Sequence, residues 1–261
     1  MKIATWNVNS LKVRLPHVLD FLARTDCDVL ALQETKTPDD AFPAADLEAA
    51  GYASVFSGQK TYNGVAILAK KETVSVSDPL LGIPGYPDPQ KRLAAATLTD
   101  REGRELRFIS AYFPNGQAPG SAKFLYKLEW LEALSGLLAS ELARHPRLAI
   151  AGDMNIAPED RDVWDPAGWK GHILVSPAER DAFRSLLALG LRDAFRMFPQ
   201  EEGSWSWWDY RKGAFQKNQG LRIDHVLVSR ALEPEVKAAA VDRAPRALPQ
   251  PSDHAPVVCE L

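Results

Sequence analysis

The chain has 261 residues, of which 46% are hydrophobic and 25% are charged. This balance is typical of a globular protein with a large core, and it excludes a disordered chain and a small disulfide-stapled domain. The formal net charge of −3 gives no overall basic signature for nucleic acid, although a local basic patch can still steer a polyanion.

The cysteines and the apolar runs indicate the setting in which the protein works. Cys27 and Cys259 follow no metal-ligand or disulfide spacing and lie beside apolar runs, so we expect buried free thiols. No apolar run is long enough to cross a bilayer, and a strand pattern begins at Ile3 with no signal peptide before it. We therefore expect a cytoplasmic protein with no membrane partner.

The first part of the chain predicts a β-α-β unit. Residues 3–7 have the pattern of a strand, residues 11–23 that of an amphipathic helix, and residues 29–33 that of a second buried strand. A single helix between two strands favours a parallel pair. Asn7 and Glu34 would then stand together at the carboxyl edge of the sheet, where α/β proteins usually bind their ligands.

The middle of the chain predicts a run of strands after a short helix near residues 44–50. The strands are expected over residues 53–57, 64–69, 73–78, 94–99 and 106–112. Successive strands without intervening helices favour antiparallel pairing, and residues 100–103 are typical of a hairpin turn. Residues 81–92 contain three prolines and are expected to form a loop, while Tyr112 and Asn115 follow the last strand.

A long amphipathic helix is predicted over residues 123–144, and an apolar strand follows and breaks at Gly152. Asp153 and Asn155 come directly after this strand. Residues two apart in an extended segment point the same way, so these two side chains can aim at one cation, water or phosphate. The alternative is an Asx-type turn at a strand end. This helix and strand resemble the opening β-α-β unit in design.

The last part of the chain contains a predicted helix over residues 177–189 and a strand over residues 223–229, and a loop feeds a final strand from residue 257. Between them, residues 205–211 are rich in aromatics, and residues 210–222 carry Arg211, Lys212, Lys217 and Arg222 without any acid. Aromatics interleaved with cations suit stacking on a base or sugar and pairing with phosphates. The alternative is a solvated face, with Trp207 or Trp208 in the core.

These elements predict a four-layer αββα sandwich, in which two packed mixed sheets carry helices on their outer faces within one domain, residues 1–261. Eight polar residues follow or begin apolar runs and would line one edge: Asn7, Glu34, Tyr112, Asp153, Asn155, Asp224, Asp253 and His254. Oxygen ligands of this kind favour magnesium, manganese or calcium over zinc. A histidine beside carboxylates suits a general base or a phosphate contact. Strand alternation leaves open whether Asp224 or His225 faces the site.

Six motifs, taken together and in order, resemble those of the exonuclease III-type abasic-site endonucleases of the endonuclease/exonuclease/phosphatase superfamily. They are Trp6-Asn7-Val8-Asn9, Leu32-Gln33-Glu34-Thr35-Lys36, Tyr112-Phe113-Pro114-Asn115, Gly152-Asp153-Met154-Asn155, Leu221-Arg222-Ile223-Asp224 and Ser252-Asp253-His254-Ala255-Pro256. The resemblance runs from residue 3 to residue 261. It implies the four-layer sandwich, a divalent metal and hydrolysis of DNA phosphodiesters.

The resemblance also implies roles for single residues. Glu34 would bind Mg²⁺ or Mn²⁺, with further metal contacts from the set Asn7, Asp153, Asn155, Asp253 and His254. Asp153 would orient or deprotonate the attacking water, Asn155 would hold that water or the phosphate, and Tyr112 would lie near the phosphate or the leaving oxygen. His254, paired with Asp224, would contact the phosphate. The residues expected to contact DNA are Asn9, Lys36, Asn115, Trp207, Arg211, Leu221, Arg222 and Ile223, of which Trp207, Leu221 and Ile223 would receive a flipped, baseless deoxyribose.

The expected partner is therefore double-stranded DNA that carries abasic sites or 3′ ends, and the expected state is a monomer. Two alternatives come from the same chemistry. Inositol-lipid phosphatases and sphingomyelinases of the superfamily would need a recognition segment different from residues 207–222, and a non-catalytic DNA-binding relative would lack some of the eight polar residues.

Overall fold

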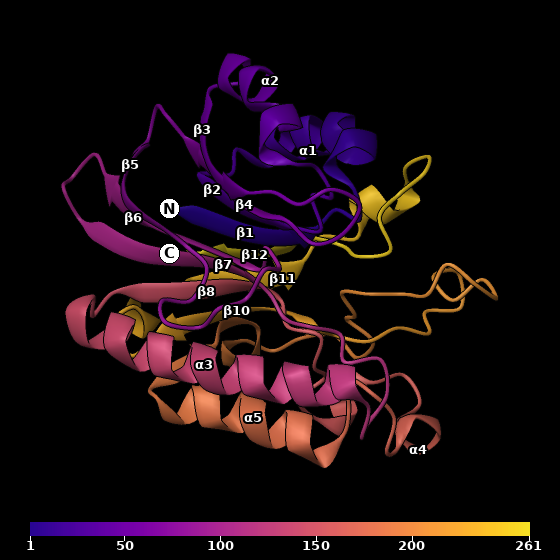
Figure 1. The fold of residues 1–261 in the computed structure, drawn as a ribbon. Coiled ribbons are helices and arrows are strands. Elements are labelled where there is room, and N and C mark those ends of the chain that lie inside the picture. Colours follow the sequence, from indigo (N-terminus) through magenta and orange to yellow (C-terminus); the bar gives the residue numbers. More distant parts are fainter.

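The computed structural model describes residues 1–261, and its centre is a pair of six-stranded sheets that pack face to face (Figure 1). The strands of the first sheet, in spatial order, are β11 (Ala238–Val241), β12 (Val257–Glu260), β1 (Lys2–Asn7), β2 (Val29–Gln33), β4 (Val65–Lys70) and β3 (Tyr52–Ser57). Those of the second are β5 (Val74–Leu81), β6 (Leu93–Asp100), β7 (Glu105–Tyr112), β8 (Leu148–Asp153), β10 (Asp224–Ser229) and β9 (Leu191–Asp193).

Helices cover the outer face of each sheet. Helices α1 (Leu11–Thr25) and α2 (Ala44–Ala49) lie on the first sheet, and α3 (Ala122–Arg144) and α5 (Pro177–Ala188) lie on the second (Figure 1). A single turn, α4 (Pro166–Trp169), and five short 3₁₀ helices occur in the connections. None of the helices combines the length and the apolar content that crossing a bilayer requires. The predicted four-layer αββα sandwich is confirmed.

Three apolar clusters fill the spaces between the four layers. The largest lies between the sheets and includes Ile3, Ile67 and Phe108. A second fills the space between the second sheet and helices α3 and α5, and a third lies under α1 and α2. Because alternate side chains of a strand point to opposite faces, each central strand contributes to the middle cluster and to one outer cluster. Such strands are buried on both faces, as continuous apolar runs predict.

Two parallel strand pairs bring distant residues to one edge. Strands β1 and β2 are parallel, with Asn7 opposite Gln33, and β7 and β8 are parallel, with Tyr112 opposite Asp153. All other strand pairs are antiparallel, and β10 begins with Asp224 opposite Asp153. The two β-α-β units therefore end at the same side of the sandwich, and β10 starts there.

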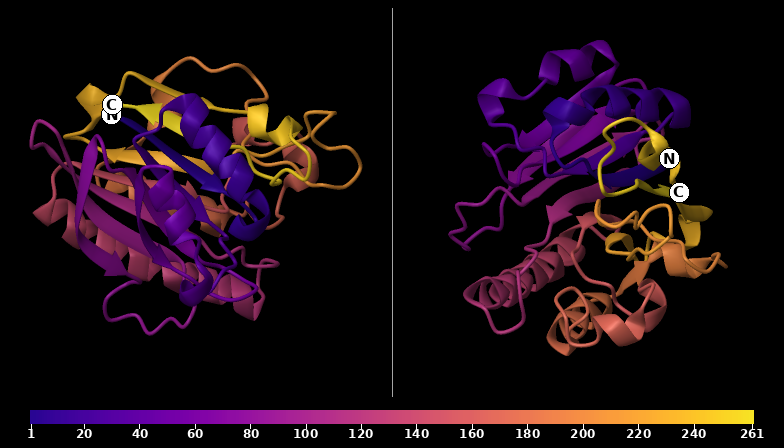
Figure 2. Two further views of the ribbon diagram at one scale, coloured as in Figure 1. Left: turned by 90° about the horizontal axis from the view of Figure 1, so that it is seen from above. Right: turned by 90° about the vertical axis from the view of Figure 1, so that its right-hand side faces the viewer.

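The structure differs from the sequence-based expectation mainly in short or edge elements. Strand β5 continues through Pro79 to Leu81 by way of a register shift after Ser77, and it is an edge strand, where a proline costs no ladder hydrogen bond. Strands β9 and β11 and helix α4 are too short to give a periodic signal and were not predicted. The first and last strands of the chain pair, and the Met1 amine donates to the Leu261 carbonyl oxygen at 2.9 Å (Figure 2).

Candidate active site

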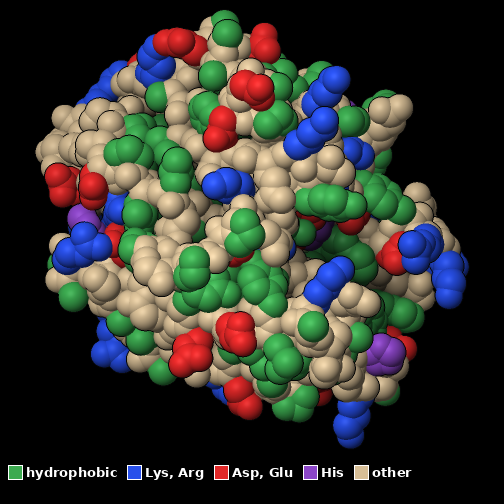
Figure 3. Space-filling model, in the orientation of Figure 1, with side chains coloured by type: hydrophobic (Ala, Val, Ile, Leu, Met, Phe, Trp, Pro, Cys, Tyr) green, Lys and Arg blue, Asp and Glu red, His purple; other side chains and the backbone are tan.

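The eight polar residues predicted to line one edge converge in a hollow between the two sheets. Figure 3 shows this hollow to the right of centre, with acidic and histidine side chains at its bottom and Lys or Arg side chains near its rim. The first sheet contributes Asn7 and Glu34, and the second contributes Tyr112, Asp153 and Asp224. The loop before β12 supplies Asp253 and His254.

Asn7 connects the two sheets across the hollow. Its Nδ2 group donates to Glu34 Oε1 and to Asp153 Oδ2, both at 2.9 Å. Glu34 Oε1 also accepts a hydrogen bond of 3.0 Å from the Tyr112 hydroxyl. These bonds place one carboxylate from each sheet on either side of a single carboxamide, with the Glu34 side chain still 19% exposed. Glu34 is therefore the carboxylate of this group that a ligand in solvent can reach.

Asp153 and Asn155 meet through a turn and not through strand alternation. Strand β8 ends at Asp153, and Asn155 has a left-handed φ of 48°. The Asn155 amide donates to Asp153 Oδ1 at 2.9 Å, and its side-chain amide lies 3.3 Å from Asp153 Oδ2. Asn115 Nδ2 donates to Asn155 Oδ1 at 3.1 Å. The Asx-type turn is therefore present, and the Asp153 and Asn155 side chains also lie together, so the two alternatives posed from the sequence are both found.

His254 lies between two aspartates. Its Nδ1 is 2.9 Å from Asp224 Oδ2, and its Nε2 is 3.7 Å from Asp153 Oδ2. Asp224 is held in turn by Ser206, whose hydroxyl donates to Asp224 Oδ2 at 2.7 Å and accepts from the amides of Ile223 and Asp224. The structure places Asp224, and not His225, in the hollow.

Asp253 is fixed by two neighbours that were expected to contact DNA. Asn9 Nδ2 donates to Asp253 Oδ1, and Trp207 Nε1 donates to Asp253 Oδ2, both at 3.0 Å. Lys36 lies 2.9 Å from Glu34 Oε2 and also bonds Asn9. These side chains thus form a second ring of contacts around the acids, and each retains an exposed part.

Burial and the close packing of charges shift the pKa values of this group. Burial raises the pKa of Asp153 to about 7, against the opposing effect of His254. Burial alone would lower the pKa of His254, but the Asp224 and Asp153 carboxylates outweigh it and raise that pKa to about 10. Burial and the Glu34 carboxylate raise the pKa of the Tyr112 hydroxyl well above its ordinary value. At neutral pH the site therefore holds an imidazolium and a protonated tyrosine.

The donor set fits a hard divalent cation. Four carboxylates, Glu34, Asp153, Asp224 and Asp253, share the hollow with only two cationic side chains, Lys36 and His254. The remaining donors are amide oxygens and the Tyr112 hydroxyl, and no thiol is near, since Cys27 is buried in the connection between α1 and β2 and Cys259 is buried in β12. Such an oxygen-rich set with excess negative charge is what Mg²⁺ or Mn²⁺ requires. Possible ligand atoms of Asp153, Asp224 and His254 also lie within 4.8 Å of one another. Because Asp224 is already bonded to His254 and Ser206, we favour a cation position beside the more exposed Glu34.

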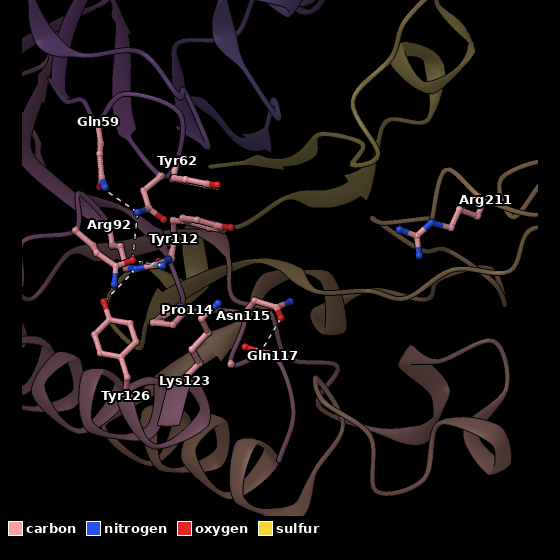
Figure 4. A pocket seen from close by; sticks show the side chains of 13 residues that line it. Gln59, Tyr62, Arg92, Tyr112, Pro114, Asn115, Gln117, Lys123, Tyr126 and Arg211 are labelled. Carbon is pink, nitrogen blue, oxygen red and sulfur yellow. Dashed lines mark hydrogen bonds between the residues drawn. The ribbon is translucent and has the colours of Figure 1, made fainter. Parts of the chain in front are cut away.

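A cleft of about 1040 Å³ opens beside the acidic group and shares Tyr112 and Asn115 with it. Figure 4 shows Tyr62, Arg92 and Lys123 along this cleft and Arg211 across from them on a separate loop. Arg92 lies over the rings of Tyr112 and Tyr126, at 4.9 and 5.8 Å from their centroids. The cleft therefore combines aromatic and cationic groups next to the acids, a combination suited to an extended polyanion.

The basic segment of residues 210–222 is only partly a surface patch. Arg211, Lys212 and Lys217 are solvent-exposed or near the surface, but Arg222 is buried and bonded to Asp162 at 2.7 Å and to Asp193 at 2.8 Å. The expectation that Arg222 contacts DNA directly is therefore wrong, because its guanidinium faces the protein interior. Its neighbours Leu221 and Ile223 are buried as well and lie with Trp207 in one small apolar cluster, so the structure does not bear out their direct contact with DNA either; Trp207 is the partly exposed residue of the three.

Three buried residues near the site were not identified from the sequence: Ser206, Lys127 and Glu179. Lys127 had a detectable signal, because it falls on the apolar stripe of α3 between Phe124 and Leu131, where a lysine is out of place. Glu179 had one as well, since it stands three residues after Ser176 as in a capping box. Ser206 gave no signal, since its role depends on packing between distant segments.

The chain is similar to known proteins over nearly its whole length. The model of the Endonuclease/Exonuclease/phosphatase family matches residues 4–254. The chain is 37% identical to the exodeoxyribonuclease III of Haemophilus influenzae over the full length of both. Among solved structures, a 3′-5′ exonuclease from Neisseria meningitidis has a TM-score of 0.94 and 48% identity, and covers 100% of this chain and 99% of its own. An AP endonuclease from Archaeoglobus fulgidus has a TM-score of 0.91 and 37% identity, with 99% and 98% covered.

Proposed function

Since the chain belongs to the endonuclease/exonuclease/phosphatase family, we propose that it is a DNA repair nuclease that hydrolyses phosphodiesters 5′ to abasic sites and releases nucleotides or blocking groups from 3′ ends. The observation that carries this proposal is the convergence of Glu34, Asp153 and His254 from three separate segments, beside a cleft with aromatic and cationic walls. Relatives that match over the full chain are named as nucleases of both kinds.

The chain's own residues suit each part of a hydrolysis. Asp153 accepts the proton of a water that attacks the phosphorus in line, and the backbone and side-chain amides of Asn155 hold the Asp153 carboxylate in position for this step. The imidazolium of His254 donates from Nε2 to a phosphate oxygen, because Asp224 holds Nδ1 on the other side. The bond from phosphorus to the 3′ oxygen breaks and that oxygen takes a proton from solvent, which leaves a 3′-hydroxyl and, at an abasic site, a 5′ deoxyribose phosphate.

A divalent cation is the cofactor that this site would take, and we propose Mg²⁺, with Mn²⁺ as a substitute. Glu34 would hold it, with contributions from Asn7 and Asp253. When bound, such an ion neutralises phosphate charge and stabilises the negative charge that develops on the departing oxygen. The excess of carboxylates over cations in the hollow is the structural support for this proposal.

Recognition of an abasic site would depend on the apolar cluster around Trp207. Trp207 forms backbone bridges to Leu221 and His254, and Ile223 lies in the same cluster. Trp207, the partly exposed residue of this cluster, would present its indole beside the imidazole that faces the phosphate. A deoxyribose without its base would fit there, whereas a nucleotide with its base would meet the indole ring.

One assay tests the proposal. The substrates are an end-labelled duplex with a single tetrahydrofuran abasic analogue, the same duplex with thymine at that position, and a duplex with a recessed 3′ end. With MgCl₂ we expect incision 5′ to the analogue, shortening of the recessed end and no internal incision of the intact duplex; EDTA should abolish both reactions and MnCl₂ should restore them. Absence of cleavage on all substrates, or cleavage that resists EDTA, would refute the assignment.

A further inference from the structure

We propose that the buried ammonium group of Lys127, backed by Glu179, is a positioning group of the active site that fixes the main chain of Asn115 and Asn155. The idea rests on the proposed nuclease function, because it concerns the same site. Lys127 lies in α3 and Glu179 in α5, and both side chains have an exposed fraction of 0%. Neither residue reaches the hollow itself, so any effect on catalysis is indirect.

The Lys127 ammonium uses its three donors on three different segments. Its Nζ atom lies 2.7 Å from the Asn155 carbonyl oxygen, 3.3 Å from the Asn115 carbonyl oxygen and 2.5 Å from Glu179 Oε1. Asn115 and Asn155 follow β7 and β8, the two strands that end at Tyr112 and Asp153. A single side chain therefore ties together the two loops that leave these catalytic strand ends.

The two carbonyl groups have no other donor. No backbone amide and no other side chain bonds the carbonyl oxygen of Asn115 or Asn155. Asn155 adopts a left-handed φ of 48°, which asparagine tolerates better than most residues. The ammonium, through its bond to the Asn155 carbonyl oxygen, stabilises this conformation, which presents the Asn155 side chain to Asp153. The stem of Lys127 also packs on the turn at Gly116, where an added Cβ would lie 3.1 Å from Lys127 Cδ.

Glu179 holds the ammonium from the other side and is itself fully bonded. Its Oε1 accepts from the Leu174 amide at 3.0 Å, and its Oε2 accepts from the Ser176 amide and hydroxyl at 3.0 and 2.6 Å. The carboxylate is therefore rigid, since it also completes the capping box of α5. Glu179, at the start of α5, thus holds Lys127, and Lys127 holds the carbonyl groups of Asn115 and Asn155. The Asn115 side chain bonds that of Asn155, which in turn bonds Asp153.

A stabilising role alone does not account for this pair. A buried ion pair generally contributes little to stability, and an uncharged pair of similar volume is often equally stable. An apolar pair, however, could not donate hydrogen bonds to the carbonyl groups of Asn115 and Asn155 as the Lys127 ammonium does. Since a displacement of about 1 Å in a catalytic group can cost about a hundredfold in rate, we expect the loss of these donors to affect turnover more than folding.

A double variant separates the two roles. Lys127→Met alone leaves the Glu179 carboxylate buried without its partner, so both the melting temperature and kcat should fall. Lys127→Met with Glu179→Gln removes both charges; its melting temperature should recover in part, because the buried carboxylate no longer lacks a partner although the two carbonyl groups still lack a donor, while kcat on the abasic duplex stays about 10- to 100-fold low. KM should change less than kcat. If the variant with Glu179→Gln does not fold, Lys127→Met with Glu179→Met is the second variant to use. It too should lose more kcat than thermal stability.

A matched control is available at the opposite end of the same helix. Arg107 and Glu141 form another buried pair, at 2.5 Å, between β7 and α3, near the start of β7 and away from the site. Arg107→Met with Glu141→Gln should change stability without lowering kcat. If the Lys127 double variant recovers kcat together with stability, or if the control loses kcat equally, the positioning role is overturned. An inactive wild-type protein would instead refute the nuclease function, so the two failures are distinguishable.

Discussion

His254 faces Asp224 with one ring nitrogen and Asp153 with the other, at 2.9 Å from Asp224 Oδ2 and 3.7 Å from Asp153 Oδ2. The short contact orients the imidazole and keeps it protonated, so that Nε2 carries a hydrogen towards the hollow. One buried aspartate therefore prepares the imidazole, while the other faces the position where a water and a phosphate would meet.

Asp224→Asn tests this relationship. The variant keeps the shape of the side chain but removes the larger of the carboxylate charges that raise the pKa of His254. We expect kcat to fall about a hundredfold or more, because the imidazole holds its proton less firmly and loses the carboxylate that orients its ring. The affinity for DNA, measured in EDTA by fluorescence anisotropy, should change little. An unaltered kcat would show that the charge of the imidazole does not matter to the reaction.

Asp153→Asn should abolish cleavage and preserve binding. A carboxamide cannot accept a proton from water, yet it can retain a hydrogen bond from the Asn155 amide. Single-turnover assays should show a loss of about a thousandfold or more, with the Kd for the abasic duplex within a few fold of the wild-type value. Substantial turnover by this variant would remove Asp153 from the role of proton acceptor.

Trp207 should affect selection of the abasic site more than hydrolysis. Trp207→Ala removes the indole ring of the apolar cluster and also the hydrogen bond to Asp253. Trp207→Phe removes the hydrogen bond but keeps an aromatic ring in the cluster, and it serves as the control. We expect kcat/KM on the abasic duplex to fall about tenfold or more in the alanine variant, with a smaller loss on a recessed 3′ end. Equal losses on both substrates would argue against a pocket.

The two arginines of the basic segment should behave in opposite ways. Arg211→Ala removes a cation beside the cleft, so DNA binding should weaken and the slope of log Kd against log salt should decrease by about 1. Arg222→Ala leaves Asp162 and Asp193 without their main partner, and the free energy of unfolding should fall by about 3 to 5 kcal/mol. Urea titration and anisotropy distinguish the two. A stable Arg222→Ala protein with a reduced salt slope would contradict the structure.

Because His225 is buried in its neutral form, the free energy of unfolding should decrease in mild acid. Its Nδ1 faces Arg222, its Nε2 lies 2.9 Å from the Ile156 carbonyl oxygen, and Asp193 and the Phe183 ring are near. Because Arg222 donates to Nδ1, the ring is neutral, and burial followed by Arg222 lowers the pKa of His225 to about 4. The unfolded chain takes up this proton near pH 6.5, so the stability is complete above that pH and decreases as the pH falls towards 4.

The difference between the free energies of unfolding at pH 7 and pH 5 measures this effect. For His225 it should amount to about 2 kcal/mol, in addition to the contribution of the carboxylates. His225→Gln can accept from Arg222 but has no such titration, so this variant should lose less stability over the same interval. If the free energy of unfolding of the wild type and of His225→Gln decreased equally between pH 7 and pH 5, His225 would not be responsible for the effect.

The elements that form the site were largely predictable because they depend on local signals. Apolar runs that stop at a polar residue predicted β1, β2, β7, β8 and β10, and the residues at their ends meet as expected. Periodicity predicted helices over residues 11–23 and 123–144, which the structure extends by two residues at Thr25 and by one at Ala122.

The features that were missed depend on contacts between segments distant in sequence. Nothing near Arg222 indicates that Asp162 and Asp193 will surround it, so its charge was taken as part of a surface patch. The Asx-type turn that joins Asn155 to Asp153 was predicted only as an alternative to strand alternation, because a left-handed residue after a strand follows no periodicity. The choice between Asp224 and His225 required the position of His254, which strand β12 and its preceding loop determine.

The catalytic groups belong to two sheets that are joined mainly by side-chain packing, and the bonds from Asn7 to Asp153 and from Tyr112 to Glu34 are among the few hydrogen bonds between them. Neither half of the sandwich holds a complete set of groups, so the enzyme has no smaller working unit. Any slippage of one sheet over the other, even with every strand and helix intact, would separate Glu34 from Asp153. Activity should thus disappear at lower urea concentration than the circular dichroism signal, and a crosslink between the layers should delay its loss.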